Sequence, residues 1–70
     1  MGIKTMIQDL QAMGLSTASI ARLVNAELEG SGQTITGERI RQLGKLEHTF
    51  GTTRERAAAI TMVWVNSFIK

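Results

Sequence analysis

The sequence predicts an all-α fold with one small domain, residues 1–70, and four helices, at about 3–13, 17–28, 37–48 and 53–69. The 70 residues include no proline, and glycines at positions 14, 30, 32 and 51 divide the chain into segments of helical length. In each segment apolar residues recur at steps of three and four, the spacing of one helix face. A chain this short has only a small core, so we expect oligomerisation to add stability.

The first two helices each have one apolar stripe. In residues 3–13 it consists of Ile3, Met6, Ile7, Leu10 and Met13. In residues 17–28 it consists of Ile20, Leu23, Val24 and Leu28. Gly14 suits the left-handed backbone that ends many helices, and Ser16 or Thr17 can cap the second helix by accepting backbone N–H bonds.

The third helix, TITGERIRQLGKLE with its flanks, has an apolar and a cationic side. Thr36 is a good N-cap, and Ile35 before it can pack on Ile40, which fixes the angle at which the helix begins. The inward side consists of Ile40, Leu43, Leu46 or Glu47, and Phe50. Three cations point away from it: Arg39, Arg41 and Lys45.

The fourth helix is apolar on nearly every side from Ile60 onward. Thr52 and Glu55 match the reciprocal T-x-x-E capping box at its start. A helix that is apolar all round must be buried all round, so one domain of this size cannot cover it alone. We expect this helix to contact a second molecule.

Composition excludes several classes of function. The chain has no cysteine and one histidine, so disulfides, thiol chemistry and a metal site are not expected. The sequence has neither a glycine-rich phosphate loop nor paired carboxylates, the patterns that would suggest catalysis. We therefore predict a protein that is not an enzyme and takes no cofactor, metal ion or small-molecule substrate.

The basic residues are concentrated in the second half of the chain. Residues 1–35 have two basic and three acidic residues, a net charge of −1, whereas residues 36–70 have six and three, a net charge of +3. A polyanion is therefore expected to bind the second half. With no signal peptide and no apolar run of about 20 residues, we expect a complete cytoplasmic protein without a membrane partner.

The pair STASIARLVNAEL and ITGERIRQLGKLE resembles the helix-turn-helix of small phage and plasmid DNA-binding regulators and of the DNA-binding segments of recombinases. Ile20, Ala21 and Val24 match the apolar, small and apolar positions of the supporting helix. Ile40 and Leu43 match the apolar positions of the recognition helix. The resemblance covers about residues 3–50 and implies a trihelical domain that binds double-stranded DNA.

Two features depart from that family. Asn25 occupies the place where the family usually has glycine, and asparagine adopts a left-handed backbone less readily. The interval from Val24 to Ile40 is 16 residues, much longer than in the tight form of the motif. Either the turn is long or the geometry is a looser variant.

The resemblance implies which residues contact DNA. A recognition helix places its first residues against base edges, where arginine pairs with guanine and glutamine with adenine. Hydroxyl and amide groups in the turn suit phosphate oxygens, and Arg54 and Arg56 extend the phosphate track. The predicted DNA contacts are Gln33, Thr34, Thr36, Arg39, Arg41, Gln42, Lys45, Arg54 and Arg56.

We predict a sequence-specific homodimeric repressor of phage or plasmid type. Pairing through the fourth helix places two recognition helices about one turn of DNA apart. The predicted dimer contacts, shared with the domain core, are Ile60, Val63, Trp64, Phe68 and Ile69. Alternatively, the cations form a solvated face paired with Glu38 and Glu47, and the protein is an interaction adaptor that docks a partner on its fourth helix.

Overall fold

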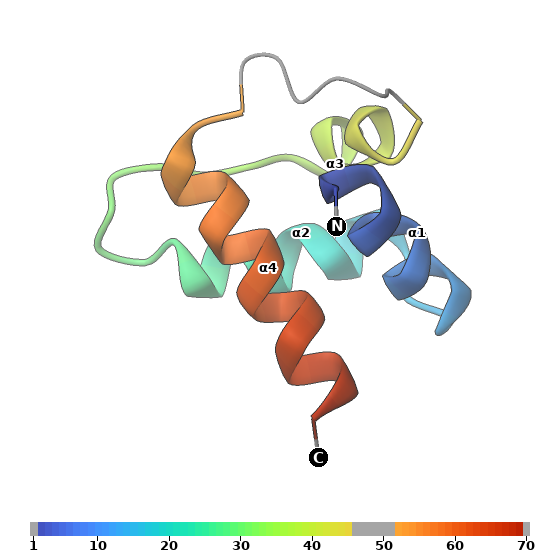
Figure 1. Ribbon diagram of the computed structural model, residues 1–70. Coiled ribbons are helices and arrows are strands. Elements are labelled where there is room, and N and C mark those ends of the chain that lie inside the picture. Colours follow the sequence, from blue (N-terminus) through green and yellow to red (C-terminus); the bar gives the residue numbers. More distant parts are fainter. Residues whose placement is uncertain (1, 46–51, 70) are drawn as a thin grey trace.

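The computed structural model describes residues 2–45 and 52–69, and these residues form helices and no strand (Figure 1). The helices are α1 (Ile3–Ala12), α2 (Thr17–Glu27), α3 (Gly37–Leu43) and α4 (Arg54–Phe68). The all-α class with four helices is therefore confirmed. α1 and α2 each end one residue earlier than the sequence predicted.

A single apolar core joins the four helices. Its most deeply buried side chains are Ile7, Leu10, Ile20, Val24, Ile40, Leu43 and Ile60. No polar or charged residue is buried in the described part of the chain. The core is thus held by apolar packing, and α4 packs on both α1 and α2 while α3 packs mainly on α2.

Gly14 ends α1 with the left-handed backbone that the sequence predicted. Its φ is +95°, and its N–H donates to the carbonyl of Gln11 at 2.9 Å. The N–H of Leu15 donates to the carbonyl of Leu10 at 3.3 Å, and the Leu15 side chain packs on the core. This pair of bonds is the Schellman arrangement, which satisfies carbonyls that a helix end leaves without partners.

Replacing Gly14 with alanine is expected to lower the free energy of unfolding by about 1 kcal/mol, because a left-handed backbone is unfavourable for a residue with a Cβ. An added Cβ would have nothing within 4 Å, so the backbone alone causes the loss. Urea denaturation followed by circular dichroism measures it. Gly2→Ala is the matched control, since Gly2 has a φ of −86° and equally open surroundings. Equal stability of the two variants would contradict this role of Gly14.

The connection between α2 and α3 is long and runs back along α2 (Figure 1). It turns at Gly30 and Gly32, whose φ angles are +87° and +78°. The Asn25 side chain then holds it by two bonds to Ile35, donating to the carbonyl at 2.9 Å and accepting from the N–H at 2.7 Å. Of the alternatives left open by the sequence, the long turn is the one observed, and Asn25 has no left-handed backbone.

This path places the start of α3 over the start of α2. A Cβ added to Gly37 would lie 3.6 Å from the Cα of Ala18 in the first turn of α2. Thr36 caps α3 as predicted, because its hydroxyl accepts the N–H of Arg39 at 3.1 Å. The end of α2 and the start of α3 are therefore far apart, unlike the short turn of the tight motif.

α3 is shorter than predicted, because it ends at Leu43 and not at residue 48. Gly44 is pressed against α1: an added Cβ would lie 3.0 Å from Cγ2 of Ile7, and the Gln8 side chain donates to the Gly44 carbonyl at 3.1 Å. The other predicted inward residues of this segment, at 46, 47 and 50, lie outside the described residues.

The predicted capping box of α4 is wrong by one residue. Thr53, not Thr52, is the N-cap and accepts the N–H of Arg56 at 3.2 Å. The strongest hydrogen bond of the Glu55 carboxylate comes from Gln33, whose Nε2 donates to Oε2 at 2.8 Å. A contact with a distant segment thus outweighs the local pairing that the T-x-x-E pattern favoured.

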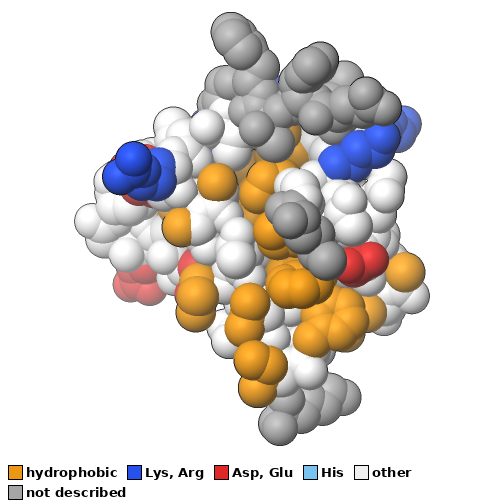
Figure 2. Space-filling view, in the orientation of Figure 1, with side chains coloured by type: hydrophobic (Ala, Val, Ile, Leu, Met, Phe, Trp, Pro, Cys, Tyr) orange, Lys and Arg blue, Asp and Glu red, His pale blue; other side chains and the backbone are white. Residues whose placement is uncertain are grey.

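α4 is only partly covered by its own chain. Ile60 and Val63 lie in the core, whereas Met62, Phe68 and Ile69 are 46%, 54% and 68% exposed. Figure 2 shows apolar side chains gathered over the C-terminal half of α4, while the visible Lys and Arg side chains lie nearer α3 and the start of α4. As predicted, one chain does not bury this helix on all sides. None of the helices among the described residues is long and apolar enough to span a bilayer.

Candidate nucleic-acid interface

α3 exposes a stripe of polar side chains on the side opposite its core residues. Ile40 and Leu43 are 0% and 1% exposed and hold the helix in the core. The outer side chains, at steps of three and four, are Glu38, Arg41, Gln42 and Lys45, and we call them the α3 stripe. Arg39 is half-buried and flanks the stripe. The predicted division holds for Ile40 and Leu43 inside and for Arg41 and Lys45 outside, whereas Arg39 is only partly exposed.

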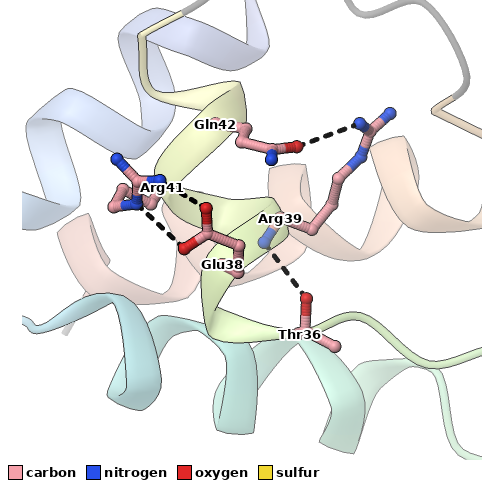
Figure 3. Close-up of polar contacts among 5 residues, drawn as sticks. All are labelled: Thr36, Glu38, Arg39, Arg41 and Gln42. Carbon is pink, nitrogen blue, oxygen red and sulfur yellow. Dashed lines mark hydrogen bonds and ion pairs between the residues drawn. The ribbon is translucent and has the colours of Figure 1, made fainter.

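Two side-chain pairs lie along α3, each three residues apart (Figure 3). The Arg41 guanidinium donates twice to Glu38, with Nε 3.0 Å from Oε2 and Nη2 bonded to Oε1. Arg39 Nη1 lies 3.5 Å from Oε1 of Gln42, the outer limit of a hydrogen bond. Arg39 and Arg41 therefore leave the helix on different sides, as Figure 3 shows.

The Glu38–Arg41 ion pair is exposed to solvent. Its side chains are 59% and 47% exposed, so water and salt screen the attraction. The hydrogen bond from Arg41 lowers the pKa of Glu38, and the same bond raises the pKa of Arg41, so both groups are charged near neutral pH. The alternative of a cation paired with an acidic neighbour thus applies to Arg41. For Lys45, no ion pair is found among the described residues.

Three of the predicted DNA contacts take part in bonds that join the α2–α3 connection to the start of α4. Gln33 accepts from the Thr53 hydroxyl at 2.6 Å and donates to Glu55 at 2.8 Å. Arg56 Nε donates to the Thr34 carbonyl at 3.0 Å. These bonds fix the segment that leads into α3. Gln33 is therefore a positioning residue, and no local pattern in the sequence indicated this.

The Gln33 bond also affects a titration. It is the main reason that the pKa of Glu55 lies below its usual value. The stabilisation from this bond is therefore present at pH values above the usual glutamate pKa, and it is lost as the pH falls through the lowered pKa. Gln33→Ala is expected to raise the pKa of Glu55 towards that of an ordinary glutamate. A pH titration of the side-chain carboxyl carbons by NMR measures the shift. Glu38 is the internal control, because its pKa depends on Arg41 and should not change.

The predicted dimer residues divide into two groups. Ile60 and Val63 are 0% and 4% exposed and belong to the core of their own chain, so they offer little surface to a partner. Trp64 is half-buried, donates from Nε1 to Asp9 at 3.1 Å, and lies 5.3 Å from the ring of Phe68. Phe68 and Ile69 are the exposed members. Of the predicted dimer residues, those that expose apolar surface thus lie at the C-terminal end of α4.

A groove of about 270 Å³ lies beside that end, between α2 and α4. It is lined by Leu23, Ala26, Glu27, Val63, Asn66 and Ser67. In Figure 1, α3 and the C-terminal end of α4 lie at opposite ends of the molecule. The polar stripe and the exposed apolar residues are therefore separate surfaces.

The described residues contain no cluster of three or more His, Cys, Asp or Glu side chains that would hold a metal ion. His48 lies outside the described residues. Arg54 is exposed at the start of α4.

No family model matches the chain, and neither a curated protein nor a solved structure shows a significant similarity to it.

Proposed function

We propose that the protein binds double-stranded DNA with the α3 stripe and acts as a homodimeric repressor of phage or plasmid type. The observation that supports this most is the α3 stripe itself, with Arg41, Gln42 and Lys45 exposed on a helix whose other side is fixed in the core. Side chains on a fixed helix lose little further freedom on binding, which favours specific recognition.

The size of α3 suits this role. An α-helix with its side chains is about 10–12 Å in diameter, and the major groove is about 12 Å wide, so α3 can enter it. Gln42 has an amide that can pair with adenine, and Lys45 supplies a mobile charge for a phosphate. Arg39 and Arg54, on the flank and at the start of α4, are further phosphate contacts in this proposal.

Pairing of two chains strengthens such binding. One unit makes few phosphate contacts, and non-specific affinities of such proteins are weak, ~10⁻⁴–10⁻⁶ M at physiological salt. Met62, Phe68 and Ile69 are exposed at the end opposite α3, so contact there leaves both α3 stripes accessible. The dimer would occupy an operator and block polymerase.

Fluorescence anisotropy with a labelled random-sequence duplex, at about 50 and 200 mM salt, tests DNA binding. If the protein neutralises several phosphates, affinity falls steeply between these concentrations, because condensed counterions are released on binding. Absence of binding at the lower concentration would contradict the proposal.

The exposed apolar residues favour a second candidate, an interaction adaptor that docks a protein partner on the C-terminal half of α4. Met62, Phe68 and Ile69, with the neighbouring groove, provide the surface. An adaptor would show no salt-dependent DNA binding, and its association would weaken on substitution of Phe68 but not of Arg41.

A further inference from the structure

We propose that Arg41 reads a guanine base and that Glu38 is the positioning residue that aims it. This inference rests on the proposed DNA-binding function and names the base that one position of α3 selects. In the sequence, Glu38 was indicated only as a possible partner of the neighbouring cations. The geometry of the Glu38–Arg41 pair gives it a second role.

A guanidinium group has two edges that can each donate two parallel hydrogen bonds. Glu38 occupies the side edge of Arg41, where Nε is 3.0 Å from Oε2 and Nη2 bonds Oε1. The end edge, formed by Nη1 and the second proton of Nη2, bonds none of the described residues. That edge matches O6 and N7 of guanine, the two acceptors that this base presents in the major groove.

The carboxylate makes a phosphate an unfavourable partner for this pair. A phosphate oxygen close to Arg41 would also approach Glu38, and the two negative charges repel. A base edge has no net charge, so the pair can meet it without that cost. Lys45, one turn further along the stripe, is within electrostatic range of Glu38 but forms no ion pair with it, so its ammonium group is available to a phosphate.

Glu38 also restricts the rotamers of Arg41 before DNA binds. An arginine side chain loses considerable freedom when it is fixed, and two bonds from the same helix remove part of that cost in advance. Removal of the carboxylate is therefore expected to have opposite effects on two kinds of DNA. Binding to random DNA becomes tighter as a negative charge disappears. Binding to the preferred sequence becomes weaker, because Arg41 is no longer held in the orientation that meets the guanine.

The experiment begins with selection of preferred duplexes from a random library by the intact protein. Each guanine of the selected site is then replaced by 7-deazaguanine, which lacks the N7 acceptor, and affinity is measured by anisotropy. The wild type is expected to lose about tenfold at one guanine position. Arg41→Ala, which removes the donors altogether, is expected to be insensitive at that position.

Glu38→Gln tests the positioning role. We expect the ratio of affinities for selected and random duplexes to fall about tenfold, with tighter binding to random DNA. Circular dichroism checks that this exposed substitution leaves the helices intact. An unchanged ratio, or a 7-deazaguanine effect that persists in Arg41→Ala, would overturn the inference while DNA binding itself stands. Absence of any salt-dependent binding would overturn both proposals.

Discussion

Ile60→Ala is expected to destabilise the protein by about 2–5 kcal/mol, a large fraction of the total stability of so small a domain. Ile60 is 0% exposed in a core that joins α4 to α1 and α2. Domains typically have a stability of about 0.05–0.15 kcal/mol per residue, which for 70 residues is about 3.5–10 kcal/mol. Urea denaturation followed by circular dichroism measures the loss.

Ile69→Ala is the matched control, because it removes the same atoms from a side chain that is 68% exposed. Its effect on the unfolding of a single chain is expected to lie within about 0.5 kcal/mol. If Ile69 contacts a second copy, its effect will instead depend on protein concentration. Equal, concentration-independent losses in the two variants would contradict the assignment of Ile60 to the core and Ile69 to the surface.

Arg41→Ala is expected to weaken binding to a selected DNA site by more than tenfold while the fold is retained. The side chain is exposed and makes no core contact, so its loss removes base contacts rather than packing. Lys45→Ala is expected to differ: it should weaken binding to all sequences alike and reduce the salt slope by about 1, as loss of one phosphate contact does. Anisotropy titrations over a range of salt concentrations separate the two effects.

Arg22→Ala is the control for both variants, since Arg22 is also exposed and basic but belongs to α2. It removes one positive charge from the protein without touching the α3 stripe. An Arg22 variant that binds as weakly as the Arg41 variant would mean that general charge, and not the α3 stripe, determines affinity.

Local features of the fold were predictable because they depend on nearby residues. Ser16 and Thr36 cap α2 and α3 through their own hydroxyls, which accept N–H groups three residues ahead. Gly14 has the left-handed backbone that ends α1. The apolar stripes also identified the inward side of α3, where Ile40 and Leu43 are buried. Helical spacing alone was sufficient to place these side chains.

Contacts between distant segments could not be predicted in this way. The path of the α2–α3 connection depends on Asn25, which bonds Ile35 ten residues away, and on Gln33, which bonds Thr53 and Glu55 beyond α3. Each of these side chains has several possible local partners in the sequence. Only the packing of α4 beside the connection selects the partners that are observed.

The apolar residues of α4 illustrate a related difficulty. The sequence showed that they are too many for one helix face, but not which of them the chain itself would bury. Packing on α1 and α2 covers Ile60 and Val63, and it leaves Phe68 and Ile69 exposed because α4 extends past its neighbours towards its C-terminal end (Figure 1). The candidate contact surface is therefore smaller than the predicted one.

The role of the α3 stripe is tested most directly by an NMR titration of the labelled protein with a duplex selected for tight binding. If α3 enters the groove, the largest amide shifts will fall between Thr36 and Lys45, and the side-chain signals of Arg41 and Gln42 will move with them. Amides near Phe68 and Ile69 will change little on DNA binding. Shifts centred on the C-terminal half of α4, or none at α3, would contradict the account.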